Sequence, residues 1–158
     1  MLLTAALALY GLYYLVVPDH FGLLDHVDLA IHEAGHLVFG PFGEFVGVFG
    51  GTLMQLLFPL AFAWYFWRRH DRHAATVAAW WVAQNLWNIA RYVQDAQAQE
   101  LPLVGSGEHD WTYLLGEVGL LEQDQFVGQL VRVTGMLVFA YSTMRGLTYA
   151  RQPTRGWE

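Results

Sequence analysis

The sequence predicts an all-α integral membrane protein, a helix bundle with four to five transmembrane helices in a single domain spanning residues 1–158. Hydrophobic residues make up 55% of the chain and charged residues only 14%, against about a quarter in soluble domains. The apolar residues are concentrated in long runs without charge, which is typical of segments surrounded by lipid. Short linkers without internal repeats separate these runs, so one bundle accounts for the whole chain.

The first two apolar runs carry no charge at all. Residues 1–18 lack the basic start and the small-residue cleavage site of a signal peptide, so we expect a retained membrane anchor. Residues 45–67 would reach about 34 Å as a helix, which is enough to cross a hydrocarbon layer of about 30 Å. Pro59 lies inside this run and is expected to kink the helix.

The two later runs each contain an arginine. Residues 74–96 include Arg91 and residues 125–144 include Arg132; we expect both runs to be spans whose polar groups face the bundle interior. Two membrane topologies are open for residues 25–43. In one they form a fifth span, and in the other they enter the outer leaflet and return to the same side.

Arginine placement predicts the orientation, because short loops rich in Arg or Lys stay in the cytoplasm. The loop after residues 45–67 and the C-terminal tail hold three arginines each, whereas residues 98–124 hold acidic residues and no basic one. We therefore expect a bacterial inner-membrane protein with a cytoplasmic C-terminus and with residues 98–124 outside. The arginines concerned are Arg68, Arg69, Arg72, Arg145, Arg151 and Arg155.

The composition excludes several function classes. The chain has no cysteine, so disulfides, thiolate zinc sites and a cysteine nucleophile are absent. It has no lysine either, which removes Schiff-base chemistry and a P-loop. A net charge of -6 argues against a nucleic-acid partner, since neutralising phosphates needs a basic face. The expected partners are the lipid bilayer, a membrane protein or peptide substrate, and a larger membrane complex.

The strongest local signal is an H-E-x-x-H motif in an apolar helical segment. His32 and His36 project from adjacent turns of one helix face and can bind a single metal ion, which we expect to be Zn²⁺. Glu33 is offset from that pair, where it can act as the catalytic base toward a metal-activated water. The alternative is a pair of buried histidines hydrogen-bonded to carboxylates such as Asp25 or Asp28.

A catalytic zinc usually takes a third protein ligand, and the best source is a block in the acidic outer segment. Glu108, His109 and Asp110 stand side by side there, just before a short helical stretch. We favour His109 as the ligand, with Asp110 next, either as a ligand or as a residue that orients one. Asp110 could instead cap the following helix, and Glu108 could be solvated.

A polar stripe follows one face of the third span at spacings of four, three and four residues. It consists of Gln84, Asn88, Arg91 and Asp95. Asn88 and Arg91 are candidates for substrate binding through hydrogen bonds to an extended chain or a developing oxyanion. The structural alternative, which we favour, is contact between helices, with Arg91 and Asp95 paired one turn apart.

With its motif at His32 to His36 and the glycine-rich apolar stretch that follows, the chain resembles the site-2 protease family of intramembrane zinc metalloproteases. The resemblance implies zinc bound by His32, His36 and a distant aspartate, with Glu33 as the base, and protein substrates in or beside the membrane. The family's Asn-Pro…Leu-Asp-Gly signature is missing, and Asp110 is the remaining candidate for its aspartate. Residues 100–121 are also similar to a segment of small bacterial membrane proteins of unassigned function that carry H-E-x-x-H.

These observations predict a membrane-embedded zinc-dependent hydrolase, most simply a peptidase. The alternative is a non-enzymatic accessory subunit of a larger membrane complex, in which the metal or the polar residues serve structure. A third interpretation, a lipid-modifying metal oxygenase, lacks the second E-x-x-H pair expected of di-iron bundles.

Overall fold

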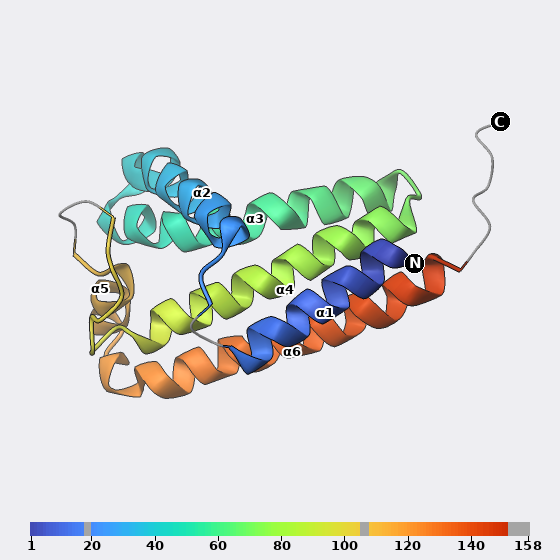
Figure 1. Cartoon of the computed structure of the whole chain (residues 1–158). Helices are drawn as coiled ribbons and strands as arrows, with labels where there is room; N and C mark the ends of the chain where they lie inside the picture. Colours follow the sequence, from blue (N-terminus) through green and yellow to red (C-terminus); the bar gives the residue numbers. More distant parts are fainter. Residues whose placement is uncertain (18–19, 105–107, 152–158) are drawn as a thin grey trace.

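The computed structural model describes residues 1–17, 20–104 and 108–151, and the regular structure of this part is entirely helical, which confirms the predicted all-α class. Two short 3-10 turns, Gly40–Phe42 and Leu121–Gln123, precede α3 and α6. Arg155, one of the arginines used for the orientation, lies outside the described residues. The helices in Figure 1 are α1 (Leu2–Val16), α2 (Leu23–Phe39), α3 (Glu44–Arg68), α4 (Arg72–Gln94), α5 (Asp110–Glu117) and α6 (Asp124–Tyr149).

The long helices begin and end close to the predicted apolar runs. Residues 45–67 correspond to α3, which continues as a helix through Pro59. Asp71 caps α4 by accepting a hydrogen bond from the Ala74 N–H at 3.0 Å, so this helix begins before the predicted run. Residues 25–43 become α2 and the turn that leads directly into α3.

The number of membrane spans is not shown by the helices themselves. In the described ranges, α3 alone is both long and apolar enough to cross a membrane by length and composition. The helix α1 is apolar, but its 15 residues reach only about 22 Å. The helices α4 and α6 are long but carry more polar residues. A bundle of four to five spans therefore remains a prediction.

The helix α4 is central to the arrangement (Figure 1). Its most extensive partner is α6, and α3 packs on it from another side. The helix α1 lies beside α4 and α6, while α2 packs mainly on α3. The short helix α5 lies at the end of the bundle where α4 ends and α6 begins (Figure 1). This order brings α2, the beginning of α3 and α5 to the same end of the molecule (Figure 1).

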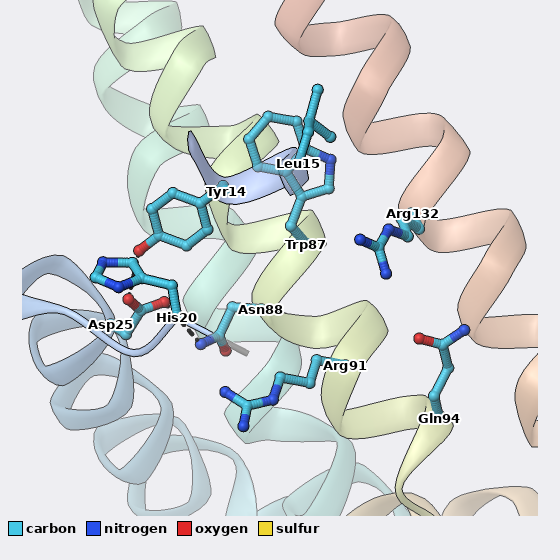
Figure 2. Close-up of a pocket in the computed structure, with 9 residues that line it drawn as sticks. All are labelled: Tyr14, Leu15, His20, Asp25, Trp87, Asn88, Arg91, Gln94 and Arg132. Carbon is cyan, nitrogen blue, oxygen red and sulfur yellow. Dashed lines mark hydrogen bonds between the residues drawn. The ribbon is translucent and has the colours of Figure 1, made fainter. Parts of the chain in front are cut away.

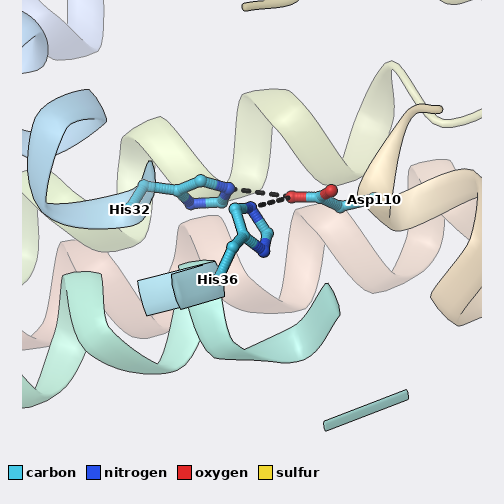
Figure 3. A group of neighbouring side chains, drawn as sticks. All are labelled: His32, His36 and Asp110. Atoms are coloured by element: carbon cyan, nitrogen blue, oxygen red, sulfur yellow. Dashed lines mark hydrogen bonds and ion pairs between the residues drawn. The ribbon is translucent and has the colours of Figure 1, made fainter. Parts of the chain in front are cut away.

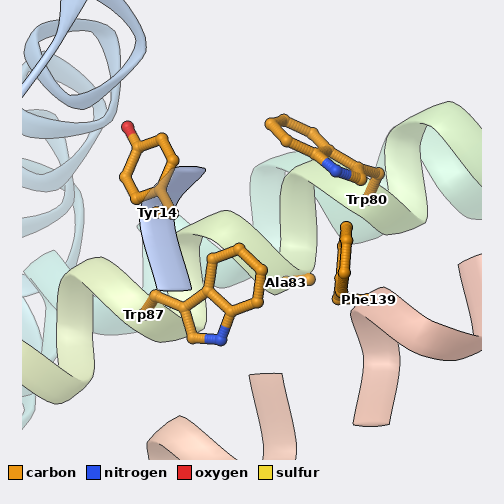
Figure 4. Packing of buried hydrophobic residues seen from close by; sticks show 5 residues of the cluster. All are labelled: Tyr14, Trp80, Ala83, Trp87 and Phe139. Carbon is orange, nitrogen blue, oxygen red and sulfur yellow. The ribbon is translucent and has the colours of Figure 1, made fainter. Parts of the chain in front are cut away.

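An aromatic cluster joins α1, α4 and α6 (Figure 4). Tyr14, Trp80, Ala83, Trp87 and Phe139 are all buried there. The Trp87 and Phe139 rings lie 5.3 Å apart, within the range in which aromatic pairs attract beyond simple burial. The cluster fixes α4 against α1 and α6 and leaves another face of α4 free to carry polar groups toward α2 and α3.

The helices α2 and α3 meet through glycines. A Cβ added at Gly35 would overlap the Gly50 carbonyl oxygen, and one added at Gly50 would lie 2.5 Å from the Phe39 Cβ. Only residues without side chains permit this backbone approach. The approach holds the helix that carries the H-E-x-x-H motif directly against α3.

Buried polar groups and exposed apolar groups are both numerous in the described part of the chain. Several of the most buried side chains are polar, among them Asp25, Asp28, Gln84 and Asn85, each at most 1% exposed. Many large apolar side chains are exposed instead, and these lie mainly on α1, α3 and α6. Monomeric soluble proteins rarely expose contiguous apolar patches of more than a few hundred Å².

Candidate metal centre

Three side chains from two distant segments converge on one point (Figure 3). The Nε2 atoms of His32 and His36 lie 2.8 Å and 3.3 Å from the same oxygen, Oδ2 of Asp110. All three candidate ligand atoms lie within 4.8 Å of one another. Ligand atoms on a tetrahedral zinc, with bonds of about 2.0–2.2 Å, are about 3.4 Å apart. A small adjustment of the three side chains would therefore seat one ion.

The helix α2 supplies the two imidazoles, because residues four apart lie on the same face. Their rings are 4.8 Å apart between centroids. The His32 side chain is 7% exposed and that of His36 27% exposed. The site is therefore enclosed on the His32 side and accessible to water on the His36 side.

The segment between α4 and α5 delivers Asp110. Asp95, at the end of α4, accepts hydrogen bonds from the backbone N–H groups of Glu100 at 2.9 Å and Leu101 at 3.1 Å. The Asp110 N–H donates to the Tyr92 hydroxyl at 3.2 Å, and the Thr112 hydroxyl donates to the Ala96 carbonyl. These bonds fix the start of α5 beside α4, so that Asp110 faces α2.

His109, the residue favoured from sequence as the third ligand, has another role. Its Nδ1 atom caps α5 by accepting the Thr112 N–H at 3.3 Å. Its Nε2 atom lies 3.3 Å from Asp95 Oδ2, without the alignment of a hydrogen bond. Both ring nitrogens are therefore directed away from the site, and Asp110, the second candidate, takes the position at the histidines. The capping role considered for Asp110 belongs to its neighbour.

The pKa shifts of Asp110 and His109 agree with Asp110 facing the histidines and His109 capping α5. Burial raises the pKa of the Asp110 carboxyl, but the hydrogen bonds and charges of His32 and His36 outweigh burial and hold that pKa below its ordinary value. Burial lowers the pKa of the His109 imidazole, and Asp95 only partly offsets this effect. Asp110 is thus an ionised acceptor, whereas His109 is a neutral cap.

Glu33 lies on α2 between the two histidines and is not one of the converging groups. Its half-buried carboxylate acts electrostatically on His36 and on Tyr92, and the Tyr92 ring lies 6.0 Å from that of His32. Glu33 therefore stands near the site without occupying a ligand position. Glu108 is exposed and does not join the group either.

The outer ring nitrogens of both histidines have partners. His36 Nδ1 lies 2.9 Å from the Gly47 carbonyl oxygen, and His32 Nδ1 lies 3.2 Å from Gln55 Oε1. An Nδ1–H that donates to an oxygen reserves Nε2 for a metal, which would replace the Nε2 proton that faces Asp110; this is the usual arrangement of metal-binding histidines. Gln55 was not predicted as a site residue, because it is one isolated amide in an apolar run.

Gly51 is a second residue that sequence reasoning missed. A Cβ at this position would lie 2.5 Å from His32 Nε2 and 2.7 Å from His36 Cε1. The absence of a side chain on α3 therefore leaves the room in which the imidazoles converge. The glycine-rich stretch was noted, but its register against α2 is a tertiary property.

We expect Gly51→Ala to weaken zinc binding at least about tenfold, because metal sites tolerate misplacement of only about 0.5 Å. The added methyl group must displace one or both imidazoles. Gly116→Ala is the matched control, since a Cβ there meets nothing within 4 Å. Zinc affinity can be measured by competition with a chromophoric chelator. Equal affinity of the two variants would remove Gly51 from the site.

The polar stripe on α4 is mainly committed to contacts between helices. Gln84 donates to Asp25 at 2.9 Å and Asn88 donates to Asp25 at 3.1 Å. Asn88 and Arg91 also line a hollow of about 180 Å³ between α1, α2, α4 and α6 (Figure 2). Ligand pockets are usually about 300–1,000 Å³, so this hollow suits a small group or waters. Substrate binding by Asn88 and Arg91 remains a prediction.

Two imidazole nitrogens and one carboxylate oxygen form a donor set that suits catalytic zinc, which keeps a further position for water or substrate. The residues present therefore fit the expected metal by chemistry and by convergence. No family model, curated protein or solved structure matches the chain.

Proposed function

We propose that this protein is a membrane-embedded zinc-dependent peptidase. The observation that carries the proposal is the convergence of His32, His36 and Asp110, with Glu33 beside them on the motif helix. An aspartate that reaches two motif histidines from a distant segment also supports the resemblance to site-2 proteases. We extend that resemblance to the class of substrate, a polypeptide in or beside the membrane.

Each residue then has a role in peptide hydrolysis. Zinc, when bound, makes a water molecule acidic near neutral pH and polarises the substrate carbonyl. Glu33 takes the proton of that water and returns it to the leaving amine, as a general base and then a general acid. Asp110 and the two imidazoles hold their positions through the contacts of α2, α3 and α5. The exposed side of His36 leaves an approach for the substrate.

Membrane embedding is supported by the surface of the bundle. Only 28% of the apolar window of α3 is buried, unlike the core helix of a soluble protein. At the end of α3, the Arg68 guanidinium lies over the Trp64 ring and that of Arg69 over the Tyr65 ring. Arginines above exposed Trp and Tyr rings are typical of a membrane–water interface. We place this end of the bundle at the cytoplasmic face of a bacterial inner membrane.

We expect the protein to remain in the membrane pellet after extraction with alkaline carbonate, because its exposed apolar surface favours lipid. The cysteine-free chain also permits a test of orientation by single-cysteine labelling. A membrane-impermeant maleimide should label Glu100→Cys in intact cells and His70→Cys only after lysis. Complete release by carbonate would contradict membrane embedding, and the reverse labelling pattern would contradict the orientation.

The proposed activity is tested with the full chain in detergent micelles. We expect bound zinc, cleavage of an unfolded protein such as casein, loss of cleavage with a zinc chelator and recovery when zinc is restored. Stoichiometric zinc without cleavage of soluble or membrane peptides would instead favour a structural metal in an accessory subunit. Absence of bound zinc would contradict the metal centre itself.

A further inference from the structure

We propose that Gln55 and Asn88 are positioning residues for His32. Asp25 fixes which end of the Asn88 amide donates, Asn88 fixes which end of Gln55 donates, and Gln55 therefore presents an acceptor to His32 Nδ1, which reserves Nε2 for the metal. We call Asp25, Asn88 and Gln55 the amide relay. This inference rests on the proposed metal centre and deepens it. None of the three residues is a candidate ligand.

The amide relay begins at Asp25, whose side chain is 1% exposed. Its Oδ2 atom accepts from the Tyr14 hydroxyl and from the Gly22 N–H at 2.8 Å. Its Oδ1 atom accepts from Gln84 Nε2 at 2.9 Å and from Asn88 Nδ2 at 3.1 Å. Figure 2 shows Asp25 and Asn88 side by side. A carboxylate only accepts hydrogen bonds, so Asn88 must present its NH₂ group to Asp25.

The orientation of Asn88 determines that of Gln55. With its NH₂ group on Asp25, Asn88 directs Oδ1 toward Gln55, which donates from Nε2 at 3.0 Å. Gln55 then has only Oε1 to offer on its other side, where His32 Nδ1 lies at 3.2 Å. Each amide has one donor end and one acceptor end, so the polarity set by Asp25 reaches His32 across two side chains.

The consequence for His32 is a fixed tautomer. A neutral imidazole carries one N–H, and the Gln55 oxygen selects Nδ1 as its position. With a metal bound, the lone pair then lies on Nε2; without metal, Nε2 donates to the Asp110 carboxylate at 2.8 Å, which can only accept. If Gln55 were reversed, its NH₂ group would meet Nδ1 and favour a proton on Nε2, which blocks the ligand atom. His36 needs no such relay, because its Nδ1 faces the Gly47 backbone carbonyl, an acceptor that cannot reverse.

Zinc affinity of purified variants, measured by chelator competition, tests the amide relay. We expect Gln55→Leu to weaken zinc binding by about 10–100-fold, the range for residues that orient metal ligands. Gln55→Glu should keep near wild-type affinity, because a carboxylate presents an acceptor to His32 in either orientation. Asn88 can then turn its NH₂ group to the new carboxylate, while Gln84 still donates to Asp25. Asn88→Leu should weaken binding several-fold, because Gln55 is then free to reverse. Zinc binding by the wild type is the premise, and its failure would contradict the proposed metal centre instead.

The decisive comparison is Asn88→Leu in the Gln55→Glu background. A carboxylate has no donor end to reverse, so the loss caused by Asn88→Leu should disappear there. A role for Asn88 in packing alone would cost the same affinity in both backgrounds and would overturn the inference.

Discussion

Replacing Asp110 by Asn should abolish stoichiometric zinc binding, whereas replacing His109 by Asn should preserve it. Asp110 Oδ2 is the point at which the two imidazoles converge, at 2.8 Å and 3.3 Å, and an amide oxygen is a far weaker zinc ligand than a carboxylate. Mutating a residue that only orients a ligand lowers metal affinity by about 10–100-fold. We expect Asp110→Asn to lower zinc affinity by more than this.

The control is matched to the local structure. His109 begins α5 as its cap, and Asn is among the best capping residues, so His109→Asn should keep α5 and Asp110 in place. Zinc content after dialysis, with circular dichroism as a check on folding, measures both variants. Retained zinc in Asp110→Asn together with lost zinc in His109→Asn would reverse the ligand assignment.

The second large effect is expected at Glu33. Glu33→Gln should keep the bound zinc but reduce peptide hydrolysis by about 10²–10⁴-fold, the contribution of a positioned general acid–base. Gln has nearly the shape of Glu but cannot accept the proton of the water. Glu33 is not among the converging ligand atoms, so zinc content should be unaffected.

Glu44→Gln is the control for charge, since Glu44 is exposed in the first turn of α3. It should retain both zinc and hydrolysis. Steady-state cleavage rates, normalised to zinc content, separate loss of chemistry from loss of metal. Undiminished hydrolysis in Glu33→Gln would exclude Glu33 as the base and leave the metal centre intact.

The sequence predicted the helices well because their signals are local. Apolar runs placed α3, α4 and α6 within a few residues of their observed limits, apart from the C-terminal end of α6. It also predicted that the side chains of His32 and His36 would lie together, because they are one helical turn apart. Spacing within one helix requires no knowledge of what surrounds it.

The polar stripe on α4 was predicted only in part. Its helical spacing correctly indicated a face turned toward other helices, and Gln84 and Asn88 do meet Asp25 there. The expected Arg91–Asp95 pairing stays a prediction, and side-chain spacing did not indicate that Asp95 accepts the backbone N–H groups of Glu100 and Leu101. Backbone donors in a loop leave no signal in side-chain spacing.

The sequence by itself determined a helical, lipid-compatible chain and two imidazoles on one helix face, since both follow from hydropathy and from the helical repeat. Only the tertiary structure chose Asp110 over His109, because that choice depends on how α5, 78 residues beyond His32, is capped and packed. It alone placed Gly51 beneath the imidazoles and Gln55 behind His32. Such contacts depend on the register between helices, which residue spacing along one chain segment does not encode.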